Sequence, residues 1–144
     1  MEKRKRMISD IDKKHLEAFI LRVGSEIVSD AKDIAPHVTG NLESDIQVWD
    51  DNISNLEIEV GNSKLTPYAV YVHDGTDPYV IRPKNAKALK TPYGPRKKVN
   101  HPGIKANPYL ENSVDNYNSK PALDDLGNKI CEDVFINIKK GFNK

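Results

Sequence analysis

The chain has 144 residues, 38% of them hydrophobic, with 22 lysines and arginines against 21 aspartates and glutamates. This length fits one domain with a single core, and the balanced charge excludes a global attraction to nucleic acid, anionic membranes or acidic substrates. The single cysteine, Cys131, excludes an internal disulfide and a cysteine-rich zinc site, and it fits a reducing compartment.

Membrane and export signals are not apparent in the sequence. No apolar run approaches the roughly 18–20 residues that a membrane-spanning helix needs, so no membrane partner is expected. Four of the first six residues are basic, but no signal-like apolar region follows them. The sequence therefore predicts assembly in the cytosol.

A long helix is predicted after a disordered basic arm at residues 1–8. Ser9 and Asp12 resemble a capping box. Apolar residues then recur at helical spacing along one face: Leu16, Phe19, Ile20, Val23, Ile27 and Ile34. Pro36 ends this helix, because the residue before a proline disfavours helical geometry.

The middle of the chain predicts strands and a loop. Two segments alternate with polar residues and predict an antiparallel hairpin: Leu42, Ser44, Ile46 and Val48, then Leu56, Ile58 and Val60. The following stretch is rich in proline: Pro67, Pro78, Pro83, Pro92, Pro95 and Pro102. Short apolar pieces at residues 68–72 and 79–81 predict one or two strands, and residues 77–105 are predicted to form an extended loop.

Two helices are predicted near the C-terminus. Asn107 is a suitable N-cap for a short helix with Pro108 at its first position, ending at about Tyr117. A last helix begins at Pro121, ends before Gly141 and carries one apolar stripe: Leu123, Leu126, Ile130, Val134 and Ile138. Residues 1–144 are therefore expected to form a single α+β domain, in which an antiparallel sheet packs against the long N-terminal helix and the C-terminal helices.

Several residues are typical of structural turns, and one of these turns contains two carboxylates. The turn residues are Pro36, Gly40, Gly75, Pro102 and Gly103. Asp74 and Asp77 flank Gly75 and could ligate a cation, although they match ordinary Asx-turn chemistry better.

No catalytic, metal or cofactor site is expected. His15, His37, His73 and His101 could form a zinc or nuclease site with the two aspartates, but no pair has the close spacing of a familiar metal motif. Ser25, Ser44 and Ser113 occupy no nucleophile-elbow context. Cys131 is near the apolar stripe of its helix, which favours a position in the core. We therefore expect that the protein is not an enzyme.

Three motifs occur in order along the chain. They are APHVTGNL at residues 35–42, YAVYVHDGT at residues 68–76, continued by Ile81, Pro83, Lys84 and residues 86–89, and HPGIKANPYL at residues 101–110. Together they cover roughly residues 9–116, and each alone is a weak signal. In this order they resemble the small neck and tail-completion proteins, or head-tail joining proteins, of long-tailed bacteriophages and prophages.

The resemblance implies a structural virion protein that assembles as a ring between head connector and tail and completes the joint. Its implied partners are further copies of itself, in a ring of roughly six or twelve subunits, and the head connector and tail proteins. Non-specific contact with genomic DNA is a further implied interaction. The expected location is the virion, and the cytoplasm of the bacterial host during assembly.

The proline-rich loop is the predicted interface. A long loop is costly to keep unless it is functional or disordered, and proline reduces the entropy lost on docking. The predicted contact residues are Tyr79, Ile81, Tyr93, Arg96, Lys97 and Lys98. Alternatively, the aromatic residues fill the core of the domain, and this is the favoured interpretation for Tyr109. A second functional hypothesis is a small DNA- or RNA-binding accessory protein that uses the basic loop and the basic N-terminal arm.

Overall fold

The computed structural model describes residues 2–142, and it places the side chains of residues 12–134 and of Ile136. The helices are α1 (Glu2–Ile34), α2 (Asn41–Ser44), α3 (Ala69–Asp74), α4 (Tyr109–Asp115) and α5 (Lys120–Phe142), with a 3-10 turn, η1, at Ile53–Asn55. The strands are β1 (Ile46–Trp49), β2 (Glu59–Asn62), β3 (Tyr79–Ile81) and β4 (Val99–His101). This mixture of helix and antiparallel sheet confirms the α+β prediction.

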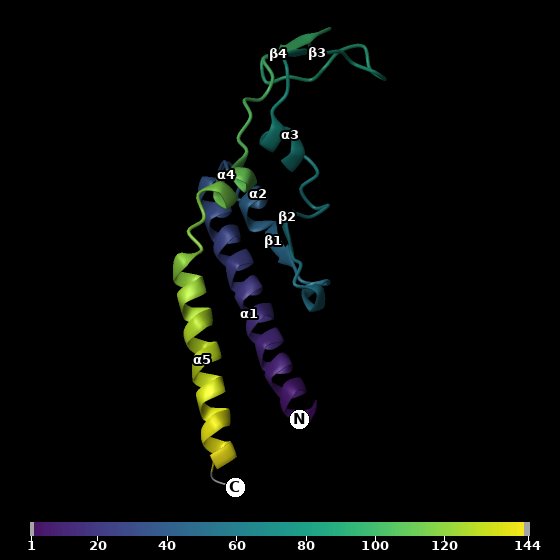
Figure 1. Cartoon of the computed structure of the whole chain (residues 1–144). Helices are drawn as coiled ribbons and strands as arrows, with labels where there is room; N and C mark the ends of the chain where they lie inside the picture. Colours follow the sequence, from purple (N-terminus) through teal and green to yellow (C-terminus); the bar gives the residue numbers. More distant parts are fainter. Residues whose placement is uncertain (1, 143–144) are drawn as a thin grey trace.

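Helix α1 is the element on which the others assemble. The β1–β2 hairpin lies along one side of α1, and α4 and α5 lie along another (Figure 1). Strands β3 and β4 are at the opposite end of the molecule from the first turns of α1 and the last turns of α5. The C-terminal helices therefore pack chiefly on α1, whereas the sequence analysis expects them to pack on the sheet. No helix among the described residues has the length and apolar character needed to cross a bilayer.

The strands form two separate antiparallel pairs instead of one sheet. In the first pair Ile46 is opposite Asn62 and Val48 is opposite Val60, which confirms the predicted hairpin. The second pair, β3 and β4, does not pair with the first. The prediction that the first strand begins at Leu42 is wrong, because residues 41–44 form the single helical turn α2. Alternation over so few residues does not distinguish a strand from one turn of helix.

The core is at the junction of α1, α2, α3 and α4. It consists of Ala31, Ala35, Leu42, Ile46, Ala69 and Tyr109. Ala31 in α1 and Ala35 directly after it have small side chains, which let the other elements approach this end of the helix closely. Tyr109 is 1% exposed, and its hydroxyl donates a hydrogen bond to Oδ1 of Asn62 at 2.6 Å. This satisfies the polar end of a buried ring and confirms the prediction that Tyr109 is a core residue.

The ends of α1 agree only in part with the sequence analysis. The helix ends at Ile34, as Pro36 predicts. It begins at Glu2, where the sequence analysis expects a disordered arm, so Ser9 is within the helix and is not its cap. Glutamate, lysine, arginine and methionine are strong helix formers, and they extend the helix through this basic segment.

The C-terminal helices also differ in detail from the prediction. Helix α4 begins at Tyr109 with Pro108 at the N-cap, one residue later than predicted, and α5 continues past Gly141 to Phe142. Cys131 is exposed, so its predicted core position is wrong. Ala122 is buried and Leu123 is 49% exposed, so the predicted stripe of α5 is wrong at its first residue. Its next residues, Leu126, Ile130 and Val134, are half-buried as predicted, and the side chain of Ile138 lies outside the described residues.

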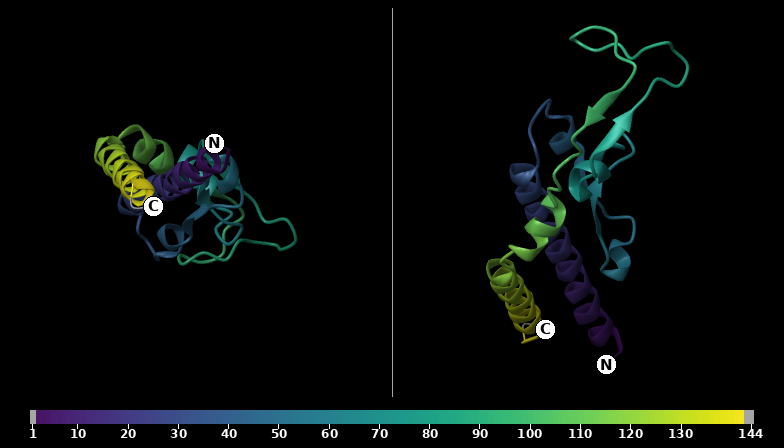
Figure 2. Two further views of the ribbon diagram at one scale, coloured as in Figure 1. Left: turned by 60° about the horizontal axis from the view of Figure 1, so that its bottom comes forward. Right: turned by 90° about the horizontal axis from the view of Figure 1, so that it is seen from above.

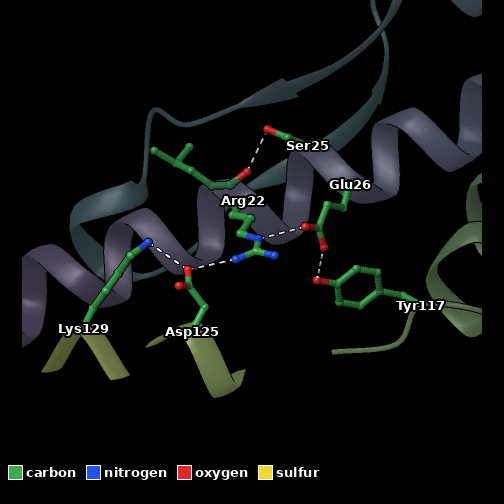
Figure 3. A network of polar contacts seen from close by, with 7 residues as sticks. Arg22, Ser25, Glu26, Tyr117, Asp125 and Lys129 are labelled. Atoms are coloured by element: carbon green, nitrogen blue, oxygen red, sulfur yellow. Dashed lines mark hydrogen bonds and ion pairs between the residues drawn. The ribbon is translucent and has the colours of Figure 1, made fainter. Parts of the chain in front are cut away.

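A polar network joins α1 to the C-terminal part of the chain (Figure 3). Arg22 donates from Nε to Glu26 at 2.8 Å and from Nη1 to Asp125 at 2.9 Å, and Lys129 also donates to Asp125. The hydroxyl of Tyr117 donates to Glu26 at 2.7 Å. Burial, followed by the hydrogen bond to Glu26, raises the pKa of Tyr117 to about 12. The network fixes the connection between α4 and α5 against α1.

Candidate functional site

A hairpin arm, residues 75–106, projects from the body of the protein beyond α3 (Figures 1 and 2). Strands β3 and β4 form its shaft, with Tyr79 opposite His101 and Ile81 opposite Val99. Two isolated bridges extend the pairing, Thr76 with Ile104 at the base and Leu89 with Arg96 near the tip. The predicted loop at residues 77–105 is therefore an arm with its own backbone pairing.

Two glycines let the chain segments cross closely at the base of the hairpin arm. Thr76 and Ile104 exchange backbone hydrogen bonds of 2.9 and 3.0 Å. A Cβ atom on Gly75 would be 2.7 Å from the backbone nitrogen of Ala106, and one on Gly103 would collide with the carbonyl oxygen of Thr76. Both glycines have positive φ, 78° and 85°. Both positions therefore require glycine for two reasons: the positive φ of the backbone and the lack of space for a Cβ atom.

The other predicted turn residues occupy turns in the structure. Gly40 has φ of 79° directly before α2, and Pro36 follows the end of α1. Pro102 follows β4, where the ring of His101 stacks on Tyr79 with centroids 4.9 Å apart. The backbone N–H of Gly103 donates to Nδ1 of His101 at 3.1 Å. His101 thus stabilises the shaft of the arm.

The tip of the hairpin arm is closed by hydrogen bonds. Leu89 and Arg96 exchange backbone bonds of 2.8 and 2.9 Å, and Gly94 donates to the carbonyl of Thr91 at 3.0 Å. The Thr91 hydroxyl donates to the carbonyl of Gly94 at 2.6 Å. Tyr93 is in this turn and is 88% exposed. The tip is therefore a hydrogen-bonded turn with a solvent-exposed tyrosine.

The six predicted interface residues are distributed along the hairpin arm. Tyr79 and Ile81 are on the shaft, where Tyr79 is 50% exposed and Ile81 is half-buried. Tyr93, Arg96, Lys97 and Lys98 are at or near the tip and are exposed. Tyr79 and Tyr93 thus do not fill the core, unlike Tyr109. Their role in an interface stays a prediction.

A cavity of about 440 Å³, which no motif in the sequence predicts, is formed at the end of the β1–β2 hairpin. It is lined by Trp49, Asp51, Asn52, Glu57, Ile58 and Glu59. All its charged lining residues are acidic. The signal in the sequence is the local charge, because residues 33–63 contain no lysine or arginine.

A second cavity, of about 430 Å³, lies beside α3 and was also missed. Val70, His73, Tyr109 and Leu110 contribute to its lining. Nδ1 of His73 is 2.8 Å from Asp74, whereas its buried Nε2 has no hydrogen-bond partner among the described residues. Its edge-on contact with Tyr109, at 5.4 Å between ring centroids, ties His73 to the core.

A clasp of polar side chains fixes the connection from β2 to α3. The carboxylate of Asp45 accepts hydrogen bonds from the hydroxyl of Ser63 at 2.6 Å and from that of Thr66 at 2.5 Å. The backbone N–H of Ser63 donates to it at 2.9 Å. These bonds, those from Ser63 first, lower the pKa of Asp45 below its ordinary value.

The groups considered for chemistry are separated in the structure. The four histidines have different partners: His15 with Asp133, His37 with Glu43, His73 with Asp74, and His101 with Gly103. Within the described part of the chain, no group of three or more histidine, cysteine, aspartate or glutamate residues is placed to hold a metal ion. The hydroxyls of Ser25, Ser44 and Ser113 each donate to a backbone carbonyl.

Comparison with known proteins identifies the family. Residues 1–75 match the HK97-gp10-like family model, described as "Bacteriophage HK97-gp10, putative tail-component". The match spans just over half of the 144 residues and includes α1, the β1–β2 hairpin and α3. It ends at Gly75, the first residue of the hairpin arm, so the rest of the arm and the C-terminal helices follow the matched part. Searches among curated proteins and among solved structures each gave no match. The chain belongs to the HK97-gp10-like family of bacteriophage tail components.

Proposed function

We propose that this chain is a structural virion protein, and not an enzyme, that assembles as a ring between the head connector and the tail and completes their joint. Membership of the tail-component family supports a structural role in the particle. The observation that carries the proposal furthest is the hairpin arm, which projects from the body and leaves its aromatic tip residue 88% exposed.

The arm has the properties of a segment that is stabilised by docking on another molecule. A two-stranded hairpin alone is marginally stable in water, and an exposed strand edge can pair with another chain. Here the hairpin is kept in shape by backbone bonds at its base and tip, so little entropy is lost when it docks. A projecting arm that contacts a different surface of the next subunit gives a head-to-tail interface, which closes into a ring when the rotation permits.

The test is deletion of the gene in its parent phage or prophage, followed by electron microscopy of the lysate. The proposal expects filled heads and free tails lying apart, with joined particles restored by a plasmid copy of the gene. Intact and infectious particles from the deletion mutant would exclude an essential role at the joint.

A second function, binding of DNA or RNA as an accessory protein, is favoured by the charge of the arm. Residues 78–110 contain lysines and arginines but no acidic residue. A protein that binds through phosphate contacts loses affinity steeply as salt rises. Binding of the purified chain to duplex DNA at about 50 and 200 mM salt therefore tests this function, and particle assembly without detectable binding would count against it.

A further inference from the structure

Charge is segregated along the chain, although the total is nearly balanced. Residues 33–63 carry seven acidic residues and no lysine or arginine: Asp33, Glu43, Asp45, Asp50, Asp51, Glu57 and Glu59. Residues 78–110 carry eight basic residues and no acid: Arg82, Lys84, Lys87, Lys90, Arg96, Lys97, Lys98 and Lys105. The first segment contains the β1–β2 hairpin, and the second contains most of the hairpin arm. Two regions of opposite charge thus occupy two different hairpins.

The acidic groove, the cavity of about 440 Å³ at the end of the β1–β2 hairpin, has the composition expected of a receptor for a basic segment. Asp51, Glu57 and Glu59 line it, and the neighbouring Asp50 is also exposed. None of these four carboxylates forms a side-chain hydrogen bond or an ion pair within the described part of the chain. Trp49 and Ile58 are half-buried and add apolar surface to the lining, so the groove can bind through apolar contact as well as charge.

The arm tip has the complementary properties. Arg96, Lys97 and Lys98 are exposed, and among the described residues no ion pair involves them. Every ion pair that the described residues form is elsewhere, on the helices and at the start of α2. Tyr93 extends from the same closed loop. A flat aromatic ring and a guanidinium group can both pack on an indole such as that of Trp49.

The tip and the groove of one subunit are far apart. In Figures 1 and 2 the arm extends beyond α3 in one direction, and the η1 end of the β1–β2 hairpin points in another. A basic occupant of the groove would therefore come from a second copy of the chain or from another protein. The second copy is favoured because it carries a preformed tip of opposite charge.

We propose that the tip of the hairpin arm of one subunit docks in the acidic groove of the next, with Arg96, Lys97 and Lys98 among its carboxylates. This inference rests on the proposed ring, for which it names the contact. The two surfaces differ, so each subunit uses its arm on one neighbour and its groove on the other, and the chain of contacts can close. Paired charges also steer the encounter and disfavour other registers.

Disulfide trapping between full-length chains tests the contact directly. Both chains carry Cys131→Ser, one carries Lys97→Cys and the other, distinguished by a size tag, carries Asp51→Cys. After mixing under mild oxidation, the proposal expects a mixed disulfide to form faster than with a matched control, Asp124→Cys, an exposed acid on α5. Equal rates with the two acceptor chains would overturn the proposal, whatever the particle phenotype of a deletion mutant.

Charge reversal separates a specific contact from general attraction. Arg96→Glu with Lys98→Glu in the donor chain should slow trapping by about tenfold or more, because like charges then face one another. Asp50→Lys with Glu57→Lys in the acceptor should restore the rate with this donor. The control acceptor carries Asp115→Lys with Glu132→Lys, at exposed acids on α4 and α5, and it should not restore the rate. Failure of the groove reversals to restore the rate would contradict docking in the groove.

This experiment also distinguishes the inference from the proposed function. Joined, infectious particles from the deletion mutant together with efficient trapping would contradict the head-tail role but support the contact between arm tip and groove. Separated heads and tails without trapping would support the head-tail role but contradict the contact between arm tip and groove. Trapping that occurs only when DNA is added, and disappears after nuclease treatment, would assign the basic tip to nucleic acid and overturn the proposal.

Discussion

The body around α1 and the hairpin arm are stabilised by different kinds of interaction. In the body, Ala31, Ile46 and Tyr109 are almost completely buried. In the arm, Tyr79 and Val80 on the shaft are half exposed, and backbone pairing and glycine crossings maintain the shape. Burial gives the body its stability, whereas the arm has a defined form and little core. This difference supports the proposal that the arm contacts another molecule.

The strongest test of this difference replaces one tyrosine in each region. Tyr109→Ala removes a ring that is 1% exposed and should destabilise the protein by about 3–5 kcal/mol, as other aromatic truncations in cores do. Tyr93→Ala at the tip should change the free energy of unfolding by less than about 0.5 kcal/mol. Denaturant unfolding of both variants checks this, and equal losses would contradict the division into body and arm.

The base of the arm can be broken without unfolding the body. Gly103→Ala places a methyl group against the carbonyl of Thr76, so the amides of Thr76 and Ile104 should lose hydrogen-exchange protection while those of α1 keep theirs. Gly94→Ala is the matched control, because Gly94 also has positive φ but has open space around it. Unchanged protection at Thr76 in the Gly103 variant would refute the close crossing.

The Asp45 clasp predicts how acid acts on the body. Because its folded pKa is lowered, the carboxylate contributes stability above its unfolded pKa of about 3.9, and this is lost as pH falls through the folded value. Wild-type protein should therefore lose stability below about pH 4 more steeply than Asp45→Asn. Unfolding measured from pH 7 to pH 2 tests this, and parallel curves for the two proteins would contradict it.

A small stabilisation is expected in α5. Gly127 is in the middle of this helix with open space around the position of a Cβ atom. Gly127→Ala should raise the free energy of unfolding by roughly 0.5–1 kcal/mol, because alanine loses less backbone entropy on folding. Gly24→Ala is the contrasting variant in α1, since its methyl group would meet Ile58 at 2.5 Å. Thermal unfolding should rank Gly127→Ala above wild type and above Gly24→Ala.

The sequence predicted elements well where the pattern was long or where a proline marked an end. Helical periodicity and Pro36 placed most of α1 and its end, and alternation found the β1–β2 hairpin. The predictions for short elements were wrong, because α2 and α3 are too brief for periodicity to distinguish helix from strand. In α5, Leu126, Ile130 and Val134 are half-buried as the stripe predicts, but Leu123 and Cys131 are exposed.

The candidate site was predictable only in part. The exposed Tyr93 and the basic residues of the arm were identified from their sequence context, and so were Gly75 and Gly103 as turn residues. The acidic groove was missed, because the hairpin brings Asp51 and Glu57 together around Trp49 from two different segments. The long run without lysine or arginine was a usable signal, but it located charge and not a cavity.

Removal of the distal arm is the most direct test of the central claim, that the arm assembles the particle. Ile81 and Val99 are paired partners, so residues 82–98 can be replaced by Asn-Gly, a turn that closes a two-residue hairpin. The shortened chain should unfold at the same temperature as wild type. In the deletion mutant it should leave filled heads and free tails unjoined, as an empty plasmid does. Joined, infectious particles from this folded variant would contradict the account.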